Sequence, residues 1–252
     1  MRLFHASVPI ATALATLLLM APAVAQPAGT ADIIARNLAA RGGDAALAAL
    51  KSVRFEGRLV FPGGFELSYA ETRAGGAARV ESALQGLVLV QAYDGKAGWR
   101  VNPFEGRKDA EAMSDDEARS LADSASIPGV LLAARTDGSR TAYLGTEDFD
   151  GTLCHKLKVE QPDGDEFVYL IDPDTMLEVK ITETRRIRGA VQVTETELGD
   201  YEAVGGVMFP MAIASGAAGS SQRQRTLIAA ATANPPAPAS LFARPASEGT
   251  RP

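Results

Sequence analysis

The sequence predicts an α+β protein that is mainly antiparallel β: a curled, half-open β-barrel of about 11–12 strands. From residue 53 onwards, apolar residues mostly recur at every second position, which is the period of a strand with one buried face. Gly, Asp and Pro separate these runs and favour hairpins between consecutive antiparallel strands. Helical spacing is confined to the start and the middle of the chain, so we expect short helices that act as a plug or lid on the curled sheet.

Residues 1–25 have the three parts of a secretory signal peptide. Arg2 supplies the basic start, the apolar run from Val8 to Met20 is 13 residues long, and Ala23-Val24-Ala25 provides small residues before a cleavage site. A membrane span needs roughly 20 apolar residues, so this run is too short to be one. No cysteine follows the cleavage site to carry a lipid. We therefore expect cleavage near Ala25/Gln26 and a soluble product in the periplasm.

The first third of the remaining chain predicts a short helix followed by strands. Thr30 can cap this helix, and Gly42-Gly43 can end it. Ile34 and Leu38 are four residues apart and share one helical face. The run Leu87–Val90 is apolar on both faces of its strand, which predicts that another segment covers it. The strands expected in this part cover residues 53–61, 65–70, 77–83, 87–93 and 99–101.

Two short helices are expected in mid-chain before the strands resume. Ser114 and Glu117 form a capping-box pattern that opens the first helix, which runs through Leu121. Pro128 suits the first turn of the second helix, which carries Leu131. The strands expected after these helices cover residues 140–148, 152–160, 166–172, 176–187, 190–202, 206–214 and 221–231.

The organisation is that of one domain between a signal peptide and a tail. The domain spans residues 26–233, and the Pro/Ala-rich tail of residues 234–252 is expected to dock partly through Leu241-Phe242. The whole chain carries 31 acidic and 25 basic residues, a net charge of −6. Binding to nucleic acid needs clustered Lys and Arg, so we expect no nucleic-acid partner.

The rare residues argue against catalysis and against a metal site. Cys154 is the only cysteine, and His155 is the only histidine after residue 25. They are neighbours in a predicted strand, so their side chains point to opposite faces and cannot form a catalytic pair. A serine triad that uses His155 stays formally open, although no G-x-S-x-G motif is present. The acidic clusters at 148–151, 163–166 and 172–174 fit hairpin turns, with a weak calcium site as the alternative. We expect no metal, no cofactor and no catalytic residue.

The order of several short motifs resembles the LolA/LolB-like superfamily of periplasmic outer-membrane lipoprotein-sorting proteins. The resemblance implies an incomplete antiparallel barrel with a helical lid over a hydrophobic cavity. It also implies binding of lipid, acyl chains or another apolar ligand. The family's lid-locking arginine is not assigned, because no motif selects among Arg54, Arg58 and Arg79. The resembling segments are Ala39–Gly43, Leu47–Ser52, Tyr93–Trp99, Asn102–Phe104, Gly205–Pro210 and Leu241-Phe242.

The leading hypothesis is therefore a non-catalytic, monomeric periplasmic protein that binds a lipid, an acyl chain or a lipoprotein in a half-barrel cavity. Lipoprotein or lipid transfer to the outer membrane is one use of such a cavity. A regulatory or sensory module that docks a periplasmic or membrane protein is the first alternative, and a paired-carboxylate hydrolase is the second. The candidate cavity residues are large and apolar, and lie in the predicted strands or lid: Phe55, Leu59, Phe61, Phe65, Leu67, Tyr69, Leu87, Leu89, Trp99, Leu131 and Phe209.

Overall fold

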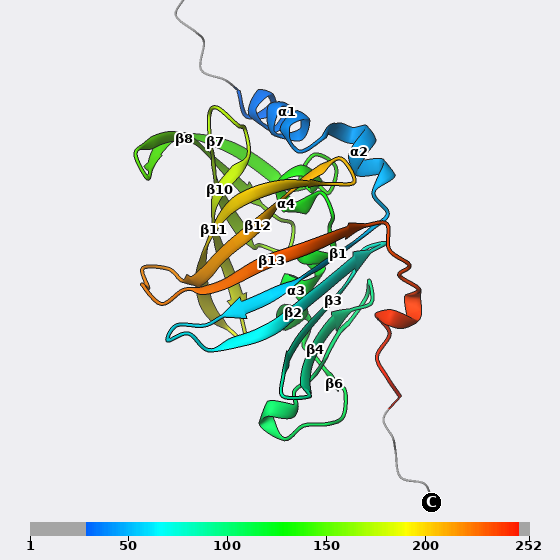
Figure 1. The fold of residues 1–252 in the computed structure, drawn as a ribbon. Helices are drawn as coiled ribbons and strands as arrows, with labels where there is room; N and C mark the ends of the chain where they lie inside the picture. The colour runs from blue at the N-terminus through cyan, green and yellow to red at the C-terminus, as the bar shows by residue number, and fades with distance from the viewer. Residues whose placement is uncertain (1–28, 247–252) are drawn as a thin grey trace, which may run out of the picture.

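A computed structural model describes residues 29–246 of the chain, shown in Figure 1. The expected signal peptide lies outside the described residues. Four α-helices and two short 3-10 helices lie within them: α1 (Thr30–Ala40), α2 (Gly43–Ala49), η1 (Pro103–Glu105), α3 (Asp115–Ala125), α4 (Gly129–Ala133) and η2 (Ala239–Leu241). No helix of this part of the chain is long and apolar enough to cross a membrane.

Thirteen strands form one sheet, which confirms the expected fold class. The expected strands account for twelve of them, and the additional one is β6, whose two residues are too few to show an alternating pattern. The first six strands are β1 (Ser52–Val60), β2 (Glu66–Ala74), β3 (Ala77–Leu84), β4 (Leu87–Tyr93), β5 (Gly98–Val101) and β6 (Glu111–Ala112). The other seven are β7 (Arg140–Phe149), β8 (Thr152–Glu160), β9 (Glu166–Ile171), β10 (Glu178–Ile187), β11 (Ala190–Val204), β12 (Val207–Ala217) and β13 (Gln224–Ala233).

The strand order β6-β5-β4-β3-β2-β1-β13-β12-β11-β10-β9-β8-β7 consists of two meanders joined where β1 pairs with β13. Neighbouring strands are antiparallel, and β6 and β7 are the two free edges. Because the edges do not pair with each other, the barrel stays open. Figure 1 shows the sheet curving around α3 and α4, with α1 and α2 at one end.

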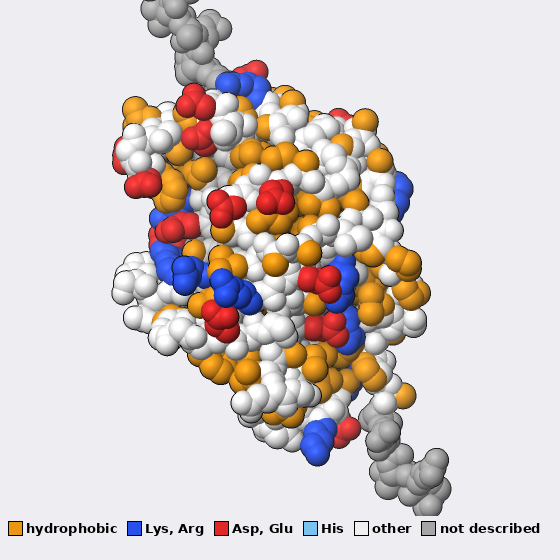
Figure 2. All heavy atoms as spheres, in the orientation of Figure 1, with side chains coloured by type: hydrophobic (Ala, Val, Ile, Leu, Met, Phe, Trp, Pro, Cys, Tyr) orange, Lys and Arg blue, Asp and Glu red, His pale blue; other side chains and the backbone are white. Residues whose placement is uncertain are grey.

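Register separates an inner face, covered by α3 and α4, from an outer face. Phe55 pairs with Glu71 on β2 and with Ala231 on β13, so these three side chains lie on the same face. Gly98 faces α3, because a Cβ at this position would lie 2.7 Å from the Ala118 Cβ. Its neighbour Trp99 therefore points to the outer face. The outer face seen in Figure 2 carries acidic and basic side chains scattered among apolar ones, without one large patch of a single charge.

The C-terminal tail crosses the outer face and covers Trp99. The indole Nε1 donates a 2.7 Å hydrogen bond to the carbonyl of Phe242, and the Phe242 ring is itself 2% exposed. The guanidinium of Arg79 lies over the indole, 5.6 Å from the ring centroid, and also donates to the Leu241 carbonyl. The tail from Pro235 to Arg244 is thus tied to the sheet by both apolar packing and hydrogen bonds.

The expected cover over Leu87–Val90 is missing at one end of the run. Leu87 is 46% exposed and Val88 is 38% exposed, whereas Val90 is buried next to Trp99. The prediction is wrong for the first two residues because they stand at the tip of the β3–β4 hairpin, where neither α3 nor the tail lies over them. The acidic clusters do form turns: Asp172, for example, accepts hydrogen bonds from the backbone N–H groups of Asp174 and Thr175.

Candidate functional site

A cavity of about 280 Å³ lies between the inner face of the sheet and the α3–α4 segment. Three of the candidate residues line it: Phe55 on β1, Phe209 on β12 and Leu131 on α4. All three side chains are almost fully buried. Small-molecule sites in proteins usually measure about 300–1,000 Å³, so this cavity, at about 280 Å³, is slightly smaller than that range.

Two aromatic rings form the floor of the cavity. The Phe55 and Phe209 centroids are 5.2 Å apart and the rings meet edge to face at 68°. The two residues come from strands that are not neighbours, since β13 lies between β1 and β12. The register partner of Phe55 on β13 is Ala231, whose small side chain leaves room for the rings to meet above it. Aromatic pairs in this arrangement contribute about 0.5–1.5 kcal/mol beyond their buried area.

An arginine lies against each of these rings. The guanidinium carbon of Arg73 is 5.4 Å from the Phe55 centroid, and that of Arg41 is 5.7 Å from the Phe209 centroid. Both arginines line the cavity, together with one acidic residue, Glu178. The floor is therefore a row of Arg73, Phe55, Phe209 and Arg41, with a cation at each end.

Arg73 is held by a carboxylate behind it. Its Nε and Nη2 donate to the two oxygens of Glu71 at 2.8 and 2.9 Å, and the Tyr69 hydroxyl donates to Glu71 at 2.7 Å. Burial alone would lower the pKa of Arg73, but the Glu71 carboxylate outweighs it and raises that pKa. Burial, with Glu71 beside it, raises the pKa of Tyr69 well above its ordinary value. Arg73 is therefore charged and Tyr69 is neutral throughout the physiological range.

Arg41 joins the end of α1 to the sheet. Its Nε donates to the Met208 carbonyl at 2.9 Å and its Nη1 donates to Glu178 at 3.1 Å. In return, the Met208 N–H donates to the Arg41 carbonyl at 3.1 Å. The Tyr201 hydroxyl donates to the Glu178 carbonyl at 2.8 Å, and burial raises the pKa of Tyr201. Two of the motifs that suggested the family, residues 39–43 and 205–210, thus contact each other at this point.

Helix α3, which leads into the α4 roof, is fastened to the sheet by a buried ion network. Arg185 on β10 donates to Asp123 of α3 at 2.5 Å and to Asp165 at 2.6 Å. Burial alone would lower the pKa of Arg185, but Glu183 and Asp123 outweigh it and raise that pKa. Removing one partner of such a buried group typically costs about 3–5 kcal/mol, because a charge is left without compensation. Helix α3 is therefore held in a defined position against the sheet.

The other candidate residues lie elsewhere. Leu59, Leu67, Tyr69 and Leu89 share the inner face with Phe55 but do not line the cavity. Phe61 and Phe65 pack against each other at the β1–β2 tip, and Phe65 is 51% exposed. Leu87 stands at the β3–β4 tip, and Trp99 lies on the outer face under the tail.

Several cavity residues were not among the sequence candidates. The pattern Tyr69-x-Glu71-x-Arg73 could have indicated Arg73, because it places three polar groups at every second position of one strand, on the face that must be buried. Arg41, directly before Gly42-Gly43, carried no comparable signal. The lining residues that were not sequence candidates include Arg41, Arg73, Tyr169, Glu178, Ile181, Tyr201 and Ile228.

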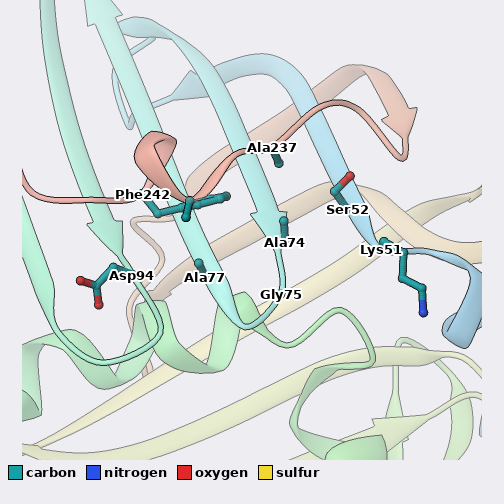
Figure 3. Close-up of a pocket in the computed structure, with 9 residues that line it drawn as sticks. Lys51, Ser52, Ala74, Gly75, Ala77, Asp94, Ala237 and Phe242 are labelled. Atoms are coloured by element: carbon teal, nitrogen blue, oxygen red, sulfur yellow. The ribbon is translucent and has the colours of Figure 1, made fainter.

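A second cavity, of about 400 Å³, lies between the tail and the outer face (Figure 3). The figure shows the tail crossing the strands there, with Ala237 and Phe242 over them. Its walls are mostly Ala and Gly, and the hydroxyl of Ser52 is already bonded to the Pro235 carbonyl at 2.7 Å. Its two charged lining residues, Lys51 and Asp94, lie on opposite sides of it in Figure 3, whereas the inner cavity combines apolar walls with charged groups that are fixed by ion pairs.

The reactive residue types do not gather at either cavity. Burial raises the pKa of Cys154, which lowers its nucleophilicity at neutral pH. Burial also lowers the pKa of His155, whose Nδ1 is 3.3 Å from the Tyr143 hydroxyl. Within residues 29–246, no group of three or more His, Cys, Asp or Glu side chains is placed to hold a metal ion.

Comparison with solved structures shows a LolA-like fold. A LolA superfamily protein from Nitrosomonas europaea superimposes with a TM-score of 0.58 at 13% identity, covering 85% of this chain and 97% of that one. A domain assigned to outer membrane lipoprotein sorting, from Vibrio parahaemolyticus, gives a TM-score of 0.54 at 11% identity over 82% and 92% of the two chains. A DUF1329 family protein from Desulfovibrio piger gives 0.55 at 9% identity over 85% and 97%.

These likenesses confirm the expected fold, which is similar to that of proteins connected with lipoprotein sorting. No protein-family model and no curated protein sequence matches the chain.

Proposed function

We propose that the chain is a non-catalytic periplasmic protein that binds an apolar ligand in the inner cavity. The ligand is a lipid, an acyl chain or the acyl part of a lipoprotein, and transfer toward the outer membrane is the use that the fold favours. The observation that carries the proposal is the cavity floored by Phe55 and Phe209 and roofed by Leu131 of α4.

The energetics of an apolar chain in this cavity are favourable. Each buried methylene contributes about 0.8 kcal/mol, so ten of them contribute about 8 kcal/mol before entropic costs. That is on the order of what micromolar binding requires. Because the cavity measures only about 280 Å³, a longer chain needs the roof formed by α4 (Gly129–Ala133) to move outward.

A pair of neighbouring substitutions on β13 tests the proposal. Ile228 lines the inner cavity, whereas Leu227 points to the outer face of the same strand, and both are half-buried. Ile228→Arg places a charge where the apolar chain lies, so it should weaken binding of the neutral ligand dodecanol to the delipidated protein at least tenfold. Leu227→Arg should change this affinity less than twofold.

Native mass spectrometry and calorimetry provide the readout, with thermal unfolding to check that both variants fold. Co-purified lipid on the native chain that is absent from Ile228→Arg would support the proposal. If neither fatty acids, phospholipids nor acylated peptides bind to the delipidated native chain, the proposal is wrong.

The open sheet edge favours a second candidate function, a periplasmic interaction module. Strand β7 has ten residues and pairs only with β8, and Leu144 on it is 49% exposed. A free edge of this length can accept a strand from a partner. Hydrogen exchange that becomes slower at residues 140–149 when a periplasmic protein co-purifies would favour this function over ligand transport.

A further inference from the structure

The inner cavity is apolar over most of its surface, but Arg73 presents a guanidinium to it. One nitrogen of this guanidinium is not used by the hydrogen bonds that hold Arg73 in the fold. We propose that the ligand is an acidic amphiphile, whose anionic carboxylate or phosphate head is bound by Arg73 and whose chain lies over Phe55 and Phe209. This inference rests on the function proposed above and specifies the class of ligand.

Arg73 has donors left after its bonds within the protein are counted. Glu71 occupies Nε and Nη2, and among residues 29–246 no hydrogen bond engages Nη1. The Arg73 side chain is 20% exposed while that of Glu71 is 5% exposed, and only Arg73 lines the cavity. A ligand in the cavity therefore meets the guanidinium and not the carboxylate behind it.

The guanidinium is fixed in the orientation that such binding requires. The Phe55 ring lies against it at 5.4 Å, and Glu71 holds it through two hydrogen bonds. An arginine held in this way has little side-chain entropy left to lose when it binds an anion. Its planar fork also suits carboxylate and phosphate oxygens.

Arg41 differs from Arg73 in its exposure and in where its carboxylate partner lies. Like Arg73, it has one terminal nitrogen with no hydrogen bond among residues 29–246, but its side chain is 8% exposed against 20% for Arg73. Its Nε and Nη1 are bound to the Met208 carbonyl and to Glu178, which join α1 to β12 and β10. Glu178 also lines the cavity and balances this charge. The two ends of the floor are therefore unequal, and the head group of the ligand belongs at the Arg73 end.

The local charges set the size of the expected preference. Arg73 and Arg41 are matched by Glu71 and Glu178, so the four side chains together are neutral. The preference for an anion arises from exposed N–H donors and not from excess positive charge. A hydrogen bond to a charged group is worth enough for about a tenfold difference in affinity.

The test compares dodecanoate, dodecyl phosphate and dodecanol on the delipidated full-length mature chain by calorimetry. The two anions should bind about tenfold more tightly than the neutral alcohol. Arg73→Gln should remove this difference, so that the two anions bind to the variant no more than about twofold more tightly than dodecanol does. The ratio between the carboxylate and the phosphate then identifies which head group the site prefers.

Arg79→Gln is the matched control. Arg79 also lies over an aromatic ring, Trp99, and pairs with a glutamate two residues away, Glu81, but on the outer face. The Arg79→Gln variant should bind dodecanoate, dodecyl phosphate and dodecanol with the same affinities as the native chain. If Arg73→Gln fails to fold because Glu71 is left without a partner, the double variant Glu71→Gln/Arg73→Gln avoids the buried charge and should show the same loss of selectivity.

The outcomes separate this inference from the function on which it rests. If dodecanol binds as tightly as the anions, or if Arg73→Gln weakens all three ligands equally, the head-group assignment is wrong while apolar binding stands. If none of the three ligands binds to the native chain, the proposed function itself is wrong.

Discussion

At the scale of single residues, Gly42 determines how closely the α1–α2 corner approaches the β11–β12 turn. Its φ is +114°, and a Cβ there would lie 2.1 Å from the carbonyl oxygen of Gly206. The neighbouring Gly43 also has a positive φ, +79°, but a Cβ there would meet nothing within 4 Å. The two positions share the backbone constraint and differ in the close contact.

We therefore expect Gly42→Ala to destabilise the protein more than Gly43→Ala. Left-handed backbone strain alone should cost Gly43→Ala about 1 kcal/mol. Gly42→Ala adds a clash with backbone that cannot move aside cheaply, so its cost should be about 3 kcal/mol or more. Urea unfolding of both variants measures the difference. Equal destabilisation would show that the corner does not hold α1 against the β11–β12 turn.

Glu195 gives a pH-dependent prediction at the same scale. Hydrogen bonds from Arg223 and Lys180 lower the pKa of Glu195 in the folded protein. A lowered folded-state pKa means that the contribution to stability is complete above the unfolded-state pKa and is lost as the pH falls through the folded one. Glu195→Gln should therefore destabilise the protein at pH 7 by up to about 1 kcal/mol, and this difference should shrink as the pH falls through the lowered folded-state pKa of Glu195. A difference that persists at acid pH would contradict this prediction.

At the scale of elements, the tail acts as part of the sheet's outer cover and not as a loose end. Phe242 is 2% exposed, and its carbonyl accepts the Trp99 indole N–H. Trp99 is the only tryptophan, so its emission reports on this contact. Because the inner cavity is on the other face, ligand binding there should leave the emission wavelength unchanged.

Phe242→Ala tests the docking of the tail. It should shift the Trp99 emission to longer wavelength, because water reaches the indole. It should also lower the free energy of unfolding by about 3 kcal/mol, since a buried phenyl ring is removed. Fluorescence and urea unfolding measure both effects, and Phe104→Ala on an exposed ring should produce neither. An unchanged emission in Phe242→Ala would mean that the tail does not shield Trp99.

At the scale of the whole molecule, local sequence patterns predicted the elements well and the site only in part. The strand alternation from Val53 to Ala231 and the capping box at Ser114 depend on neighbours in sequence, and they gave strands and a helix near the observed bounds. The cavity depends on register between distant segments. Phe55 meets Phe209 only because Ala231 lies between them, and Arg41 enters the site only through its bonds to β10 and β12. The spacing of residues along the chain does not predict such contacts between distant segments.

Polar groups on the inward-facing side of a strand are the clearest sign of the site in the sequence itself. Arg73 and Glu71 interrupt the apolar face of β2, and a buried charge of this kind is retained inside a protein only when an opposite charge pairs with it. The exposure of Leu87 and Val88 could not be predicted in this way. Nothing in the Leu87–Val90 run itself indicates where helix α3, which covers the inner face, ends.

Export is the last prediction at this scale. The first element, α1, begins at Thr30, so cleavage between Ala25 and Gln26 would remove none of the described fold. Expression of the full chain in a Gram-negative host should give a periplasmic protein whose intact mass places its N-terminus at Gln26. Ala25→Arg should block processing, because the cleavage site requires a small residue at that position. Its unprocessed product should stay with the membrane fraction, held by the apolar run from Val8 to Met20. A native chain that keeps Met1 and remains in the membrane or the cytoplasm would contradict both the signal and the periplasmic role that depends on it.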